Sequence, residues 1–167
     1  MITEQEIDIA ERFFETLDAD ASRAFFEKFS ELQPNIFVYV MAMSENLKAE
    51  EAQYDSLYLT GVIFKAFETK YTTIKQISEQ ELDETEQEVI ALYQSLATDN
   101  EKDFEAGAKN VLTESAQPIL LGYVGGALTN AIEEYNEEDQ GLAFNILQTV
   151  IESFNKSVDG GGMKVVK

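Results

Sequence analysis

The chain has 167 residues with no Cys and no His, and its 32 acidic residues against 12 basic ones give a formal net charge of −20. The missing residue types exclude disulfides, thiolate chemistry, and the commonest general base and transition-metal ligand, so we expect no cofactor, no metal and no enzymatic activity. The negative charge repels phosphates and anionic lipid headgroups, so we expect neither nucleic acid nor a membrane surface to be the partner.

The N-terminal residues are acidic and lack the basic and apolar regions of a secretory signal. No apolar run approaches the ~20 residues that a membrane-spanning helix needs. A cytoplasmic protein is therefore the expectation. The apolar fraction of 44% is sufficient for one packed domain, which we assign to residues 1–157.

Apolar residues recur three and four positions apart along most of the chain, a spacing that predicts helices. The first helix carries Ile7, Ala10, Phe14 and Leu17. A second helix is predicted over residues 21–32, a third begins at Pro34, and a long fourth helix covers residues 50–78. Proline suits the first helical position because its missing N–H would have been unpaired there in any case.

Four more helices follow in the second part of the chain. The fifth carries Val89, Leu92 and Leu96, the sixth covers residues 101–116, the seventh begins at Pro118, and the eighth begins near Glu137. Polar residues at 18–20 and 98–100 are typical N-caps of the second and sixth helices. The glycines after residue 159 disfavour helix, so residues 158–167 are predicted to be a flexible Gly-rich tail.

The chain also contains an internal repeat. Three pairs of matching segments occur in the same order: Thr3–Ile7 with Thr85–Val89, Gln33-Pro34 with Gln117-Pro118, and Tyr39-Val40 with Tyr123-Val124. We therefore predict an all-α fold of about eight helices in two duplicated four-helix units, residues 3–82 and 85–157, that share a core. The two units could form a pseudo-twofold pair or a short helical solenoid.

The densest acidic stretch lies between the seventh and eighth helices, at residues 133–139. Its carboxylates could in principle hold a divalent cation, but a di-metal helical bundle needs Glu-x-x-His pairs and the chain has no His. Like charges one helical turn apart also repel each other. We interpret the stretch as a solvated loop with no metal.

The candidate site is a pocket or groove between the two repeats. Tyr39 and Tyr123 are matching polar aromatic residues, and Gly122, Gly125 and Gly126 match Val38, Met41 and Ala42. Missing side chains in the second repeat allow either close helix–helix approach or a groove for a partner side chain or a small ligand. The residues assigned to this candidate site are Tyr39, Tyr123, Gly122, Gly125 and Gly126.

These observations favour a non-catalytic, acidic, helical module that binds another protein with a basic surface. An adaptor and an immunity-type inhibitor, which neutralises a toxin, both fit this description. The alternative is a small-ligand-binding or enzymatic helical bundle with its pocket between the repeats. A homodimer formed through the duplicated surface is a third possibility, which a large self-complementary interface would distinguish.

Overall fold

The computed structural model describes residues 1–97, 100–131 and 134–158, and this part of the chain consists of helices without any strand. The predicted all-α class and the predicted number of helices, eight, are confirmed for these residues. The helices are α1 (Glu4–Glu15), α2 (Ala19–Leu32), α3 (Pro34–Ser44), α4 (Glu50–Lys70), α5 (Glu79–Leu96), α6 (Glu101–Glu114), α7 (Pro118–Asn130) and α8 (Glu137–Ser157).

Local side chains determine where most of these helices begin. Asp18 caps α2 by accepting a hydrogen bond from the Ala21 N–H, and Asn100 caps α6 in the same way. Pro34 and Pro118 occupy the first positions of α3 and α7. These four starts agree with the sequence pattern because the capping groups lie within one helical turn of the residues that they cap.

The fourth helix is shorter than predicted, since it ends at Lys70 and not at Ser78. Backbone groups of residues 71–78 form hydrogen bonds with residues elsewhere in the protein. The Ile77 N–H, for example, donates to Oε1 of Gln33 at 3.1 Å. A tertiary partner thus satisfies an N–H group that the helix would otherwise have used, so the apolar spacing up to Ile77 was misleading.

The fifth helix begins earlier than the repeat assignment implied. Its N-terminal motif is Ser78–Leu82, in which the Glu81 carboxylate accepts from the Ser78 N–H at 2.8 Å to form a capping box. At α1 the Thr3 N–H donates to the Glu6 carboxylate in the same manner, at 2.7 Å. The structural counterpart of Thr3–Ile7 is therefore Ser78–Leu82, whereas the matching Thr85–Val89 lies inside α5.

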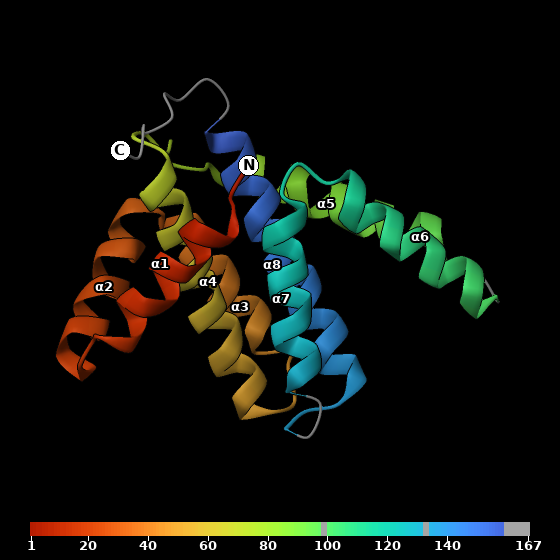
Figure 1. Cartoon of the computed structure of the whole chain (residues 1–167), viewed down its shortest axis with the longest axis horizontal. Coiled ribbons are helices and arrows are strands. Elements are labelled where there is room, and N and C mark those ends of the chain that lie inside the picture. Colours follow the sequence, from red (N-terminus) through yellow and green to blue (C-terminus); the bar gives the residue numbers. More distant parts are fainter. Residues whose placement is uncertain (98–99, 132–133, 159–167) are drawn as a thin grey trace.

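The centre of the molecule is formed by α4 and α8, and α1, α3, α5 and α7 each pack against one or both of these helices (Figure 1). The ring of Phe154 in α8 lies 5.6 Å from the ring of Phe64 and 5.5 Å from the ring of Phe67, measured between centroids. A continuous cluster of buried apolar residues joins α1–α4, which we call the first half, to α5–α8, the second half. Val158, assigned from the sequence to the tail, is buried in this cluster, and residues 159–167 lie outside the described part.

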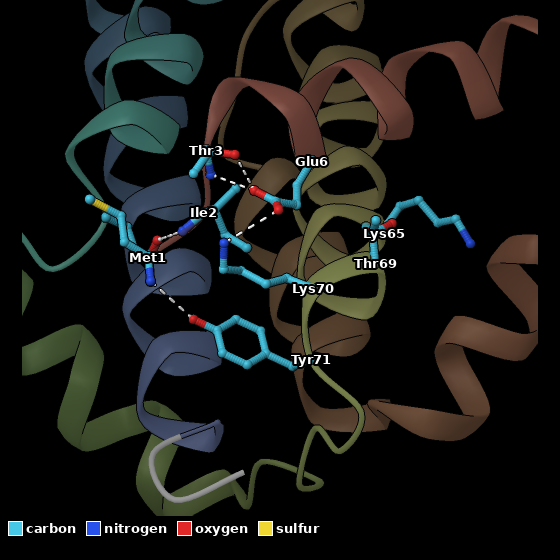
Figure 2. Close-up of polar contacts among 9 residues, drawn as sticks. Met1, Ile2, Thr3, Glu6, Lys65, Thr69, Lys70 and Tyr71 are labelled. Atoms are coloured by element: carbon cyan, nitrogen blue, oxygen red, sulfur yellow. Dashed lines mark hydrogen bonds and ion pairs between the residues drawn. The ribbon is translucent and has the colours of Figure 1, made fainter. Parts of the chain in front are cut away.

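Polar contacts hold the first residues of the chain against the body (Figure 2). The buried Ile2 N–H donates to Oε1 of Gln117 at 2.7 Å. The buried Glu6 carboxylate lies 3.3 Å from the Lys70 ammonium. Burial alone raises the pKa of Glu6, but hydrogen bonds from Thr3 and from Lys70 outweigh this effect and leave the pKa lowered. Glu6 is therefore ionised when it accepts these bonds.

Contacts between the halves occur in reciprocal pairs. Gln33, just before α3, accepts from Ile77, just before α5, while Gln117, just before α7, accepts from Ile2, just before α1. Each half thus holds the beginning of the other half. This exchange is typical of a pseudo-twofold pair, because contacts in a solenoid run in one direction only. The origin of the halves by duplication remains a prediction.

The halves differ most at their second helices. In α2, Phe25 packs edge-on against Phe14 of α1 with ring centroids 4.9 Å apart, and Phe29 is completely buried. In α6 no residue is buried, and α5 and α6 extend to one side of the molecule (Figure 1). The aromatic packing of the first half therefore has no equivalent at α6.

Candidate functional site

A groove of about 460 Å³ lies between α1, α4 and α7, and we call it the acidic groove. Two carboxylates contribute to its lining, Glu11 of α1 and Asp55 of α4. Three tyrosines join them: Tyr58 of α4, Tyr123 of α7, and Tyr135 of the segment that precedes α8. The groove lies between the halves, because α1 and α4 belong to the first half and α7 to the second.

Two of the α7 residues that line the groove, Gly122 and Gly126, are glycines and so carry no side chain. A Cβ atom at either glycine would meet no atom within 4 Å, so neither glycine serves a close approach between helices. The matching positions of α3 carry Val38 and Ala42, which have side chains. The asymmetry noted in the sequence thus coincides with an open groove beside α7.

Tyr123 and Glu11 join the two halves within the groove. The Tyr123 hydroxyl donates to Oε1 of Glu11 at 2.8 Å. Burial raises the pKa of Tyr123, and the hydrogen bond to Glu11 and its negative charge raise it further. The hydroxyl therefore remains a donor at neutral pH, and the Glu11 carboxylate keeps lone pairs that can accept additional hydrogen bonds.

Tyr135 and Asp55 form a second, weaker pair at 3.4 Å. Burial, together with the charge of Asp55, raises the pKa of Tyr135 to about 12, so this hydroxyl is also protonated at neutral pH. Burial also raises the pKa of Asp55, the hydrogen bond from Tyr135 lowers it, and the charge of Glu51 raises it again, with a net increase. The hydrogen bond from Tyr135 thus offsets only part of the free-energy cost of burying the ionised Asp55 carboxylate.

Tyr58 lies beside the same carboxylates and is 37% exposed. Burial raises its pKa first, and the charges of Glu11, Glu15 and Asp55 raise it further. An aromatic ring in contact with solvent and surrounded by negative charge is a favourable neighbour for a cation. Tyr58 thus adds an aromatic surface to the groove.

The described residues that line the acidic groove include neither Lys nor Arg. Among the described residues, Glu11 and Asp55 take part in no ion pair. No residue in the described part of the chain therefore forms an ion pair that neutralises these two carboxylates. An incoming guanidinium or ammonium group could make two kinds of contact here. It could donate hydrogen bonds to the carboxylates, and it could lie against the tyrosine rings.

The predicted site residues do not all lie together. Gly122, Tyr123 and Gly126 line the acidic groove. Gly125 lines a separate groove between α6, α7 and α8, also of about 460 Å³, which we call the apolar groove. Tyr39 lies in neither groove, and its hydroxyl donates to the Glu86 carboxylate at 3.0 Å.

Sequence reasoning missed Glu11, Asp55, Tyr58 and Tyr135. One signal could have identified Glu11. It follows the capping-box motif Thr3–Ile7 at the same distance at which Glu86 follows Ser78–Leu82, and these two glutamates accept from the two matching tyrosines. The other three residues have no such signal, because only the tertiary fold brings α4 and the segment before α8 to the same groove as α7.

In the acidic stretch that leads into α8, Glu134, Glu137 and Glu138 are exposed as expected, but Asp139 is not. Asp139 is 2% exposed and accepts from the Lys48 N–H at 3.0 Å and from the Ala49 N–H at 2.9 Å. It thereby pairs the free N–H groups at the start of α4. The described residues contain no group of His, Cys, Asp or Glu arranged to hold a metal ion, and Glu133 lies outside them.

Comparisons of the chain with protein-family models, with curated proteins and with solved structures give no match. In the described part of the chain, none of the helices has both the length and the apolar character needed to cross a bilayer. The chemistry of the two grooves is therefore the basis for assigning a function.

Proposed function

We propose that this protein is a non-catalytic binding protein whose acidic groove takes a positively charged side chain of a partner protein. The observation that carries this proposal is the lining of the groove, whose described residues include two carboxylates and three tyrosines but no basic residue. Charge-assisted hydrogen bonds are roughly twice as strong as neutral ones. A cation over an aromatic ring contributes about 0.5–1 kcal/mol more at an exposed site.

The net charge of −20 supports the same proposal, because it would attract a basic protein over a longer range. An adaptor and an inhibitor of a basic protein both fit this mode of binding, and a cytoplasmic setting remains a prediction. A second copy of the chain is a poor occupant, since two surfaces of the same sign repel each other. A basic partner protein is thus preferred to a homodimer.

A free organic cation is the second candidate. The volume of the acidic groove, about 460 Å³, lies within the roughly 300–1,000 Å³ that is typical of small-ligand sites. The same carboxylates and tyrosines would recognise an amine or guanidine that belongs to no protein. The two candidates differ in affinity, because a peptide can also make contacts outside the groove.

The test is a titration of isotope-labelled protein followed by NMR. The probes are an unstructured peptide in which Arg alternates with Gly and Ser, the same peptide with neutral citrulline for Arg, and N-acetyl-arginine amide. We expect the Arg peptide to shift the amide signals of Gly122, Tyr123 and Gly126, and the citrulline peptide to leave them unchanged. Equal affinity for the peptide and for the single arginine derivative would favour the small cation.

Two outcomes would contradict the proposal. The first is an absence of binding by any cationic probe at low salt. The second is a set of shifted signals spread evenly over the surface, without enrichment at α7, because that would indicate attraction by the overall charge and no specific site.

A further inference from the structure

The acidic and apolar grooves lie on the two sides of α7. Gly122 and Gly126 line the acidic groove, whereas Gly125 and Thr129 line the apolar one. Gly125 and Gly126 are consecutive, so the two grooves lie within about 1.5 Å of the same height along the helix axis. The outer edge of α7 between them carries no side chain at Gly122 and Gly126, where an added Cβ would meet nothing within 4 Å.

The apolar groove exists because α6 packs loosely. Phe104 of α6 is 42% exposed, and Leu112 of α6 and Phe144 of α8 are only partly buried. The first half fills the corresponding region with the aromatic side chains of α2. Apolar side chains that water still reaches can gain free energy when a partner covers them.

We infer that one amphipathic helix of a basic partner lies along α7, with its basic side chains in the acidic groove and its apolar side chains in the apolar groove. This inference rests on the proposed function and adds the form of the partner. A helix presents residues i, i+3, i+4 and i+7 on one face, so one helix can carry a basic edge beside an apolar edge. The 13 residues of α7 span about 20 Å, which is three to four turns of a partner helix.

Charge and shape both favour this occupant. The acidic groove has no basic residue in the described part of its lining, so it is complementary to Lys and Arg. Gly122 and Gly126 allow the backbone of another helix to approach α7 closely, since neither position carries a side chain. A partner that used only one groove would leave the other exposed to water.

The experiment uses two designed peptides and the full chain. The first is a capped helical peptide of about 18 residues with Arg along one edge, Leu along the adjacent edge and a single Trp. The second has the same composition in a scrambled order without helical spacing. The chain has no Trp, so Trp fluorescence reports only the peptide. We expect the patterned peptide to bind at least about tenfold more tightly than the scrambled one.

A pair of variants tests the docking position. Gly126→Leu places a bulky side chain on the outer edge of α7, where its Cβ would have no atom of the fold within 4 Å. The substitution also removes a glycine, which destabilises a helix. We expect it to weaken the patterned peptide by about tenfold or more, and to weaken the scrambled peptide, which needs no approach along α7, by less. Ala24→Leu adds a side chain to the exposed face of α2 and should change neither affinity.

The outcomes separate this inference from the proposed function. Equal binding of both peptides, abolished when citrulline replaces Arg, would overturn the helical mode and leave the cation-binding proposal standing. Tight binding of the patterned peptide that Gly126→Leu does not alter would overturn the docking position along α7. An absence of binding by either peptide would overturn both proposals.

Discussion

Tyr39 and Tyr123 make the same hydrogen bond in different surroundings. Each hydroxyl donates to a glutamate of the other half, Tyr39 to Glu86 at 3.0 Å and Tyr123 to Glu11 at 2.8 Å. Only Tyr123 also lines an open groove. The pair therefore offers a comparison in which the structural role is shared and the proposed binding role is not.

We predict that Tyr39→Phe and Tyr123→Phe each lower the free energy of unfolding by about 1–2 kcal/mol, since each removes one hydrogen bond to a carboxylate. Urea denaturation followed by circular dichroism measures both values. Only Tyr123→Phe should change the affinity for the Arg peptide. A similar change in affinity in Tyr39→Phe would argue against a specific role of the acidic groove.

Asp55 is expected to lower the stability of the protein at neutral pH. Its pKa in the folded state is raised, mainly by burial, so the folded protein binds this proton more tightly than the unfolded chain does. The free energy of unfolding contributed by this group therefore falls as pH rises from the unfolded-state pKa of about 3.9 through the folded-state pKa. Above the folded-state pKa of Asp55 the free energy of unfolding falls no further on account of this group.

Asp55→Asn should therefore raise the free energy of unfolding at pH 7, by less than about 1 kcal/mol because solvent screens a partly exposed group. Asparagine keeps an acceptor for the Tyr135 hydroxyl, so this hydrogen bond can persist. Denaturation midpoints measured from pH 3 to pH 7 provide the test. A gain in stability of equal size at every pH would show that the charge of Asp55 is not its cause.

At the scale of the helices, α2 and α6 occupy corresponding positions but differ in packing. Phe29 anchors α2 in the core, while α6 buries none of its residues. Helices with few buried apolar contacts open locally at low free energy. The aromatic cluster around Phe14 and Phe25 should therefore make α2 the more stable of the two.

We predict that amide hydrogens of α6 exchange with solvent at least about tenfold faster than those of α2, which hydrogen-exchange mass spectrometry can resolve by peptide. Binding of the patterned helical peptide should slow exchange in α6, because the peptide would cover Phe104 and Leu112. Equal protection of α2 and α6 in the free protein would contradict the loose packing of α6.

Four helix starts, those of α2, α3, α6 and α7, could be predicted from the sequence, and the end of α4 could not. Asp18, Asn100, Pro34 and Pro118 act on N–H groups within one turn, so their effect is encoded locally. The end of α4 depends on distant groups such as Gln33, which pairs the backbone of residues 71–78. The spacing of apolar residues does not reveal a hydrogen-bond partner that is distant in the sequence.

For the whole molecule, Gln33 and Gln117 form equivalent contacts between the halves. Both are nearly inaccessible, at 2% and 1% exposed. Each accepts from a backbone N–H of the other half and also donates through Nε2, Gln33 to the Lys75 carbonyl at 3.0 Å and Gln117 to Asn155 at 2.7 Å. The arrangement indicates that neither half is completed without the other.

Gln33→Ala and Gln117→Ala should each lower the free energy of unfolding by about 2–3 kcal/mol, because each leaves a buried N–H without a partner. Gln5→Ala, at an exposed position of α1, is the control and should change it by less than about 0.5 kcal/mol. Chemical denaturation of the three variants gives the values. A large loss in one glutamine variant alone would contradict the equivalence of the two contacts.

Only part of the acidic groove could be predicted from the sequence. The missing side chains at Gly122 and Gly126 were visible, because the matching Val38 and Ala42 provided a reference. The carboxylates Glu11 and Asp55 were not identified among 32 acidic residues. Their importance arises from the tertiary fold, which brings α1, α4 and α7 to one groove and which apolar spacing and repeat matching do not specify.

The central claim is that two particular carboxylates, and not the net charge, recognise a cation. Isothermal titration calorimetry of the Arg peptide with Glu11→Gln/Asp55→Asn and with Asp8→Asn/Glu27→Gln tests it most directly. Both double variants lose the same charge, and Asp8 and Glu27 are exposed residues outside the groove. We predict that the groove variant binds at least about tenfold more weakly than the control variant. Equal affinities of the two variants would contradict the claim.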